Sequence, residues 1–160
     1  MLFDNRGLSG LRILGLDPGF SSMGWSLIET IPALESLGCG VIRTKPNKTA
    51  KKCDDNVERC AMIADALVQI HEQNQFAFIA CEAQSWTRFA NADRAVAMAW
   101  GVIAATAERF GSCPIIQIRP QDAKKTICGK LSASKAEVQD MIERRIAGSQ
   151  MHLAELAKTQ

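Results

Sequence analysis

The chain has 160 residues, of which 47% are hydrophobic and 22% charged, with a formal net charge of +2. This length suits a single domain over residues 1–160 that buries its own core, and the balance of residue types excludes an intrinsically disordered chain. Met1–Gly10 lacks the basic-then-apolar order of a secretory leader, and Ala95–Ala107, the longest weakly charged stretch, is too short to span a bilayer. We therefore expect a cytoplasmic globular protein.

Three short strands are predicted in the first part of the chain. Leu11–Asp17 is an apolar run that stops at the turn Pro18-Gly19. Met23–Ile28 and Leu37–Arg43 follow at close spacing, which favours a three-stranded antiparallel meander. The polar segment Lys45–Cys53 is expected to be a mobile loop.

Helices and strands alternate after this meander. A helix with apolar residues at the period of 3.6 is predicted behind Asp54 or Asp55 as N-cap. Phe76–Cys81 is almost entirely apolar, as is typical of a strand that is covered on both faces. Ala90–Phe110 is an Ala-rich helix that should end at Gly111.

The last predicted elements are a short buried strand at Pro114–Ile118 and two helices. One helix starts at Pro120 and runs to about Cys128, and the other opens with a capping box at Ser134–Glu137. The resulting order is β-β-β-α-β-α-β-α-α. It predicts an α/β fold of the ribonuclease-H-like type, with a mixed five-stranded sheet (three antiparallel strands, then parallel β-α units) and helices on both faces.

Two carboxylates end two of the predicted strands. Asp17 ends the first strand and Glu82 ends the fourth, and these two strands are central neighbours in a sheet of this topology. Bringing the charges together costs on the order of 1 kcal/mol at about 4 Å in water, and more in a cleft, unless a proton or a metal neutralises them. Oxygen ligands favour Mg²⁺, with Mn²⁺ as a substitute. The alternative is that Asp17 only caps its turn and that Glu82 is an exposed strand end.

Cysteines and cations are the other chemically notable residues. The six cysteines form no C-x-x-C pair, so we expect reduced thiols without a zinc site. The cations gather in two stretches, which are either solvated loops or basic patches for a phosphodiester substrate. The stretches contain Arg43, Lys45, Lys48, Lys51 and Lys52, and Arg119, Lys124, Lys125, Lys130 and Lys135.

Three parts of the sequence, in order and at suitable spacings, resemble the RuvC-type Holliday junction resolvases of bacteria and phages. The matching segments are Ile13–Gly19 with Met23–Ile28, then Ile79–Glu82 with Asn91–Asp93 and Gly101–Ala104, and finally Gln121–Gly129 with Ser134–Gln139. The resemblance covers about Arg12 to Ile146. It implies a metal-dependent endonuclease of DNA recombination and repair, which cuts Holliday junctions or related branched DNA by two-metal-ion hydrolysis.

The resemblance also implies roles for individual residues. Asp17 and Glu82 match the first two catalytic, metal-binding acids of the family. Lys124 and Lys135 match lysines near the scissile phosphate, so Lys124 is a catalytic candidate, and Lys125 is a further candidate for DNA binding. The family acts as a homodimer through the helix matched here by Ala90–Phe110, which suits two symmetric cuts.

Trp86 and Arg88 are further candidates for DNA binding. Trp86 lies where the family places an aromatic wedge at the junction centre, although an aromatic here could equally pack against the next helix. Arg88 is a candidate phosphate contact.

The end of the sequence departs from the family pattern, which closes the site with an Asp preceded three residues earlier by an Asp or a His. His152-Leu-Ala-Glu155 has this spacing, so Glu155 is a possible metal ligand, but the residues after it do not continue a buried apolar helix. We therefore expect the domain to lack the last catalytic helix. The alternatives are use of Glu155, or a dimeric protein that binds branched DNA with little or no cleavage. An actin-like ATP-binding module would need a second phosphate loop, which the sequence does not show.

Overall fold

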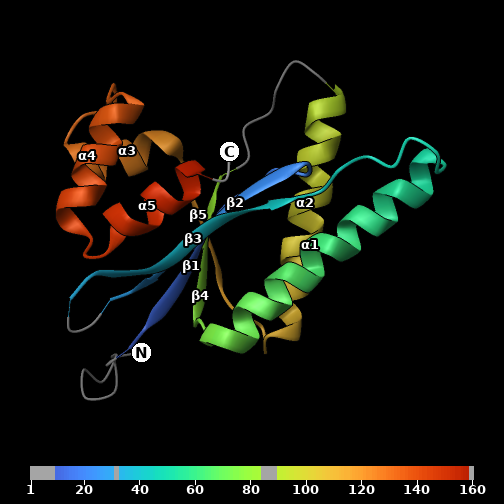
Figure 1. Cartoon of the computed structure of the whole chain (residues 1–160), viewed down its shortest axis with the longest axis horizontal. Coiled ribbons are helices and arrows are strands. Elements are labelled where there is room, and N and C mark those ends of the chain that lie inside the picture. The colour runs from blue at the N-terminus through green and yellow to red at the C-terminus, as the bar shows by residue number, and fades with distance from the viewer. Residues whose placement is uncertain (1–9, 31–32, 84–89, 159–160) are drawn as a thin grey trace.

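The computed structural model describes residues 10–30, 33–83 and 90–158, and the strands in this part of the chain form one sheet (Figure 1). They are β1 (Arg12–Asp17), β2 (Ser22–Glu29), β3 (Glu35–Arg43), β4 (Phe78–Glu82) and β5 (Ile115–Ile118). Their order across the sheet is β3-β2-β1-β4-β5. The first three strands pair antiparallel, whereas β4 pairs parallel with both β1 and β5. The predicted mixed sheet, with β1 and β4 as central neighbours, is confirmed.

The helices of the described residues are divided between the two sides of the sheet. They are α1 (Lys52–Asn74), α2 (Ala90–Arg109), α3 (Pro120–Cys128), α4 (Lys135–Arg145) and α5 (Ser149–Lys158). α1 and α2 pack against each other on one side, and α3, α4 and α5 gather on the other (Figure 1). The predicted capping box at the start of α4 is present, with Ser134 and Glu137 bonding to each other's backbone N–H. None of the helices described is long and apolar enough to cross a membrane.

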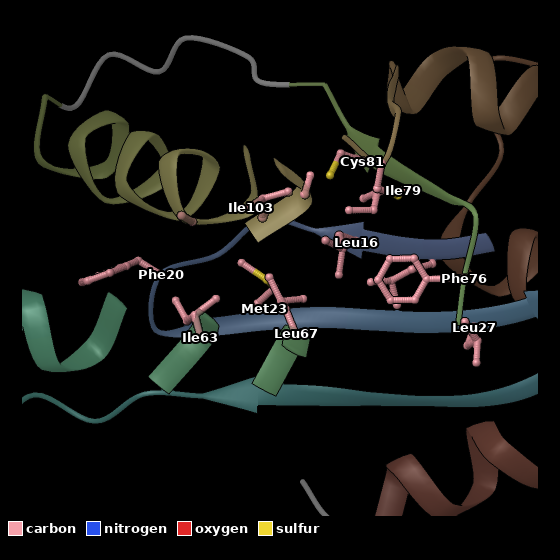
Figure 2. Close-up of a cluster of buried hydrophobic side chains, with 14 residues drawn as sticks. Leu16, Phe20, Met23, Leu27, Ile63, Leu67, Phe76, Ile79, Cys81 and Ile103 are labelled. Atoms are coloured by element: carbon pink, nitrogen blue, oxygen red, sulfur yellow. The ribbon is translucent and has the colours of Figure 1, made fainter. Parts of the chain in front are cut away.

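The hydrophobic core lies between the sheet and the pair α1 and α2. Successive side chains of a strand point to opposite faces, so every second residue of the central strands enters this core. Burial raises the pKa of the Cys81 thiol to about 12, so this cysteine acts there as a small apolar residue. The core includes Leu14, Leu16, Met23, Leu27, Ile79 and Cys81 from the sheet, Ile63 and Leu67 from α1, and Ile103 from α2 (Figure 2).

The opposite face of the same strands carries small residues. Gly15 is paired with Ser26 on β2 and with Ala80 on β4, and Ser26 is paired with Cys39 on β3. A Cβ atom on Gly15 would lie 2.7 Å from the Ser26 Oγ, so a larger residue would have to displace that serine. The side chains on this face are therefore short, and a cleft lies between the face and α3, α4 and α5.

The segment before α1 differs from its prediction. The helix begins at Lys52 behind Lys51, not behind Asp54 or Asp55, and no side chain caps it. Asp55 instead accepts a 2.7 Å hydrogen bond from the backbone N–H of Asn47. This bond ties the polar segment that was expected to be a mobile loop to the first turn of the helix.

Two elements of the C-terminal half also differ from the predictions. β5 is an edge strand and not a buried one, and its Ile116 and Ile118 are 50% and 38% exposed. An apolar run alone does not show whether a strand lies at the centre or at the edge of a sheet. The residues after Arg145, for which no helix was predicted, form α5, which packs against β3.

Candidate active site

Asp17 and Glu82 are the last residues of β1 and β4. The parallel register pairs Leu16 with Cys81, so the next residue of each strand emerges beside the other at the same end of the sheet. Neighbouring strands are about 4.8 Å apart, which places the two side chains within reach of one ion. Both carboxylates are exposed there. The predicted pairing of the two acids is thus supported by the backbone register.

The electrostatics of this pair favour a proton or a cation. Partial burial, followed by the negative charge of Asp17, raises the pKa of the Glu82 carboxyl above its ordinary value. A raised pKa means that the charged form of Glu82 is disfavoured, and a bound cation would offset that cost. The pair therefore combines oxygen donors with a repulsion that a cation between them would relieve.

Gly24 keeps one side of Asp17 open. It is paired with Asp17 across the β1–β2 hairpin, and a Cβ at Gly24 would lie 3.4 Å from the Asp17 Cβ and 4.0 Å from its Oδ2. Any larger side chain would extend over the carboxylate. Gly24 was not among the predicted site residues, although its place opposite a strand-ending Asp in a hairpin was a usable signal.

A cleft of about 790 Å³ connects the two acids to the helices on the open side of the sheet. Asp17 and Glu82 lie in its wall, and Lys135 of α4 and Leu153 of α5 also line it. Lys135 therefore faces the same space as both carboxylates. Of the predicted lysines, it is the one that lines this cleft.

Lys124 does not line the cleft of the two acids but a neighbouring hollow. It lines a hollow of about 280 Å³ between α3, α4 and α5, which Lys135 also borders. Lys125 is exposed on the same helix. None of these three lysines forms an ion pair with a residue that the structure describes, whereas Arg119 pairs with Asp122 and Lys130 pairs with Glu137. The three lysines predicted to contact DNA are therefore those of the second basic stretch that have no ion pair within the described residues.

The structure does not bring Glu155 into a metal site with the other two acids. α5 packs against β3, where His152 Nδ1 lies 2.9 Å from the Ser36 Oγ. Glu155 is exposed, and its charge adds to burial in raising the pKa of the Cys39 thiol. Among the described residues, no group of three His, Cys, Asp or Glu side chains is placed to hold a metal ion. Trp86 and Arg88 lie outside the described residues.

Comparisons with known sequences give a consistent result. The model of the family described as "Crossover junction endodeoxyribonuclease RuvC" matches residues 13–155. A protein of that description from Synechococcus sp. (strain CC9311) is 32% identical over 143 residues, which cover 85% of this chain and 84% of the relative. Another from Prochlorococcus marinus (strain MIT 9303) is 34% identical over 137 residues, which cover 85% and 84%.

Solved structures share the fold. Thermus thermophilus RuvC in complex with a Holliday junction substrate superposes with a TM-score of 0.76 at 22% identity, covering 91% of this chain and 88% of that one. The yeast mitochondrial Holliday junction resolvase superposes with a TM-score of 0.66 at 15% identity, covering 95% and 72%. These likenesses confirm the predicted ribonuclease-H-like architecture.

Proposed function

This chain belongs to the RuvC family of crossover junction endodeoxyribonucleases, and from that premise we propose that it cuts four-way or related branched DNA at Asp17 and Glu82. The observation that carries this assignment is the meeting of the two acids at adjacent ends of β1 and β4, in the wall of a cleft that Lys135 also lines. An endonuclease of this family is metal-dependent. The residues that bind the metal and the DNA are part of the proposal.

We propose Mg²⁺, with Mn²⁺ as a substitute, as the metal. Carboxylate oxygens are the donors that these hard ions prefer, and the raised pKa of Glu82 is consistent with a carboxylate pair that a cation would stabilise. Asp17 and Glu82 would bind the ion and leave its other positions to water and phosphate oxygens. A metal held there would supply Lewis-acid chemistry, which lowers the pKa of a bound water and offsets the charge that develops on the phosphate.

The lysines of the basic segment would bind the substrate phosphates. Lys135 lines the same cleft as both acids, and we assign to its ammonium group the binding of the scissile phosphate and the offsetting of its negative charge. Lys124 and Lys125 would contact the flanking backbone from α3. Trp86 and Arg88 complete the proposed DNA-binding set.

We propose a homodimer through α2. The helix exposes Ala97, Gly101 and Ala105 on one face, and a Cβ built on Gly101 meets nothing within 4 Å. Small residues at this spacing let a second helix approach closely. Two copies related by a two-fold axis would supply the two sites that symmetric cleavage of a junction needs.

One observation favours a second candidate function. Within the described residues, Glu155 does not form a metal-binding group with Asp17 and Glu82. A second metal would then be short of protein ligands. In that case the protein would bind branched DNA with little or no cleavage. A labelled four-way junction incubated with the protein in Mg²⁺ or in EDTA separates the two candidates. Cleavage in Mg²⁺ that EDTA abolishes supports the nuclease, and binding without cleavage in either supports the second candidate.

A further inference from the structure

A separate cavity lies on the other side of the turn that follows Asp17. It has a volume of about 420 Å³ and is enclosed by that turn and by the N-terminal parts of α1 and α2. Figure 2 shows Phe20, in its wall, between these two helices. Its lining residues are Phe20, Ser21, Lys52, Cys53, Asn56, Arg59, Arg94, Ala95 and Met98. Three of them are cations, and none of the described residues that line it is acidic.

Arg59 is the buried cation of this cavity, and hydrogen bonds hold its side chain in place. Its side chain is buried and donates hydrogen bonds from Nε to Thr44 Oγ1 (2.9 Å) and from Nη2 to Ser21 Oγ (2.7 Å). Its guanidinium also lies 4.2 Å from the centre of the Phe20 ring. Asp55, one turn before Arg59 on α1, forms an ion pair with it at 3.7 Å and also accepts a hydrogen bond from Asn47. Arg59 therefore holds the turn in place, and the cations of this cavity that have no ion pair among the described residues are Lys52 and Arg94.

Lys52 and Arg94 supply the exposed cations of this cavity. Both side chains are exposed at the rim, and neither forms an ion pair with any residue in the described ranges. The hydroxyl of Ser21 and the amide of Asn56 add neutral donors between them. Converging cations with neutral donors suit an anion that carries several oxygens, as a phosphodiester does.

We propose that this cavity binds a backbone phosphate of a junction arm, outside the cleft in which the DNA is cut. This inference rests on the proposed function, because it assigns the ligand as part of the same DNA substrate. The cavity and the acidic pair are joined by one short turn, since Ser21 follows Asp17 by four residues and is bonded to Arg59. A phosphate bound here would fix the arm relative to Asp17.

The test measures junction binding by the full chain in EDTA, which prevents cleavage. Fluorescence anisotropy with a labelled four-way junction would compare the wild type with the double variant Lys52→Gln, Arg94→Gln over a range of salt concentrations. We expect binding to weaken roughly five- to twentyfold and the slope of log K against log salt to fall by about 2. The charge-preserving variant Lys52→Arg, Arg94→Lys should stay within roughly threefold of the wild type.

A matched control removes the same charge at the opposite end of the sheet. Arg109 and Arg145 are exposed and lie in the last turns of α2 and α4, so Arg109→Gln, Arg145→Gln should leave the slope nearly unchanged. Equal losses in both double variants, or a loss explained by a change of oligomeric state in gel filtration, would overturn the proposal. If the wild type itself does not cut, the proposed function fails, whatever the cavity binds.

Discussion

The two faces of the sheet use neighbouring residues for opposite purposes. Leu16 and Cys81 are only 5% and 1% exposed beneath α1 and α2, while the next residues, Asp17 and Glu82, open into the cleft on the other side. Because side chains alternate along a strand, one residue step separates the core from the candidate active site. Stability and chemistry should therefore be separable by substitution in this sheet.

The largest expected effect is a loss of cleavage from substitution on the open face, which is the face of the sheet that borders the cleft. Asp17→Asn keeps the shape of the side chain but removes its charge, so cleavage of a four-way junction should fall by roughly a thousandfold or more, while binding in EDTA is retained. Single-turnover assays with labelled junction measure the rate. Asp65→Asn is the matched control, because Asp65 is exposed on α1 and lines neither the cleft nor the basic cavity. Near-wild-type cleavage by Asp17→Asn would contradict the assignment of the catalytic chemistry to this face.

Substitutions on the face that α1 and α2 cover should instead lower the stability of the fold. Ile79 is 1% exposed in β4, so Ile79→Ala should cost about 2–5 kcal/mol in the free energy of unfolding, as measured by urea denaturation. Ile118→Ala makes the same change on the exposed edge strand β5 and should cost less than about 1 kcal/mol. Equal losses at the two positions would show that the faces do not differ in packing.

Substitutions of three lysines should reduce the cleavage rate to different extents. Lys135→Ala should reduce cleavage by roughly tenfold or more, because its charge faces the cleft of the two acids. Lys124→Ala should reduce it less, and Lys48→Ala, in the loop before α1, least. Weakened binding should matter less as salt rises, because phosphate contacts release counterions. If the three variants behave alike in cleavage assays, the segment is a general basic surface.

The smallest expected effect concerns pH. The folded-state pKa of Glu82 is raised, so the stability it contributes is present at low pH and is lost as pH rises through that pKa. Thermal unfolding of the metal-free wild type should show this loss above the usual carboxyl range, with a small amplitude because Glu82 is largely exposed. Glu82→Gln should lack this pH-dependent loss and be as stable as, or more stable than, the wild type at neutral pH. A variant that is less stable there would contradict the repulsion between the two acids.

Sequence patterns predicted the elements that depend on local signals. The apolar run ending at Asp17 and its Pro18-Gly19 turn defined β1, and the order of the predicted strands paired Asp17 with Glu82. The capping box at Ser134 likewise located α4. For β1 and α4 the signal lies within a few residues of the feature that it predicts, whereas the pairing of the two acids follows from the order of the strands.

The features that could not be predicted depend on contacts between distant segments. Asp55 resembles an N-cap in the sequence, but its carboxylate accepts a bond from Asn47 and approaches Arg59. Arg59 in turn reaches Thr44 and Ser21, which no periodicity reveals. For the same reason, the edge position of β5 and the packing of α5 on β3 were missed. The expectation that the domain lacks the last catalytic helix stays a prediction.

The central claim is that Asp17 and Glu82 together bind a divalent cation on the open face. Titration of the DNA-free protein with Mn²⁺, followed by the electron paramagnetic resonance signal of the free ion, tests it most directly. The wild type should deplete free Mn²⁺, more strongly as pH rises through the raised pKa of Glu82, and Glu82→Gln should lose this binding while Glu155→Gln keeps it. Wild-type binding by Glu82→Gln, or an equal loss in Glu155→Gln, would contradict the account.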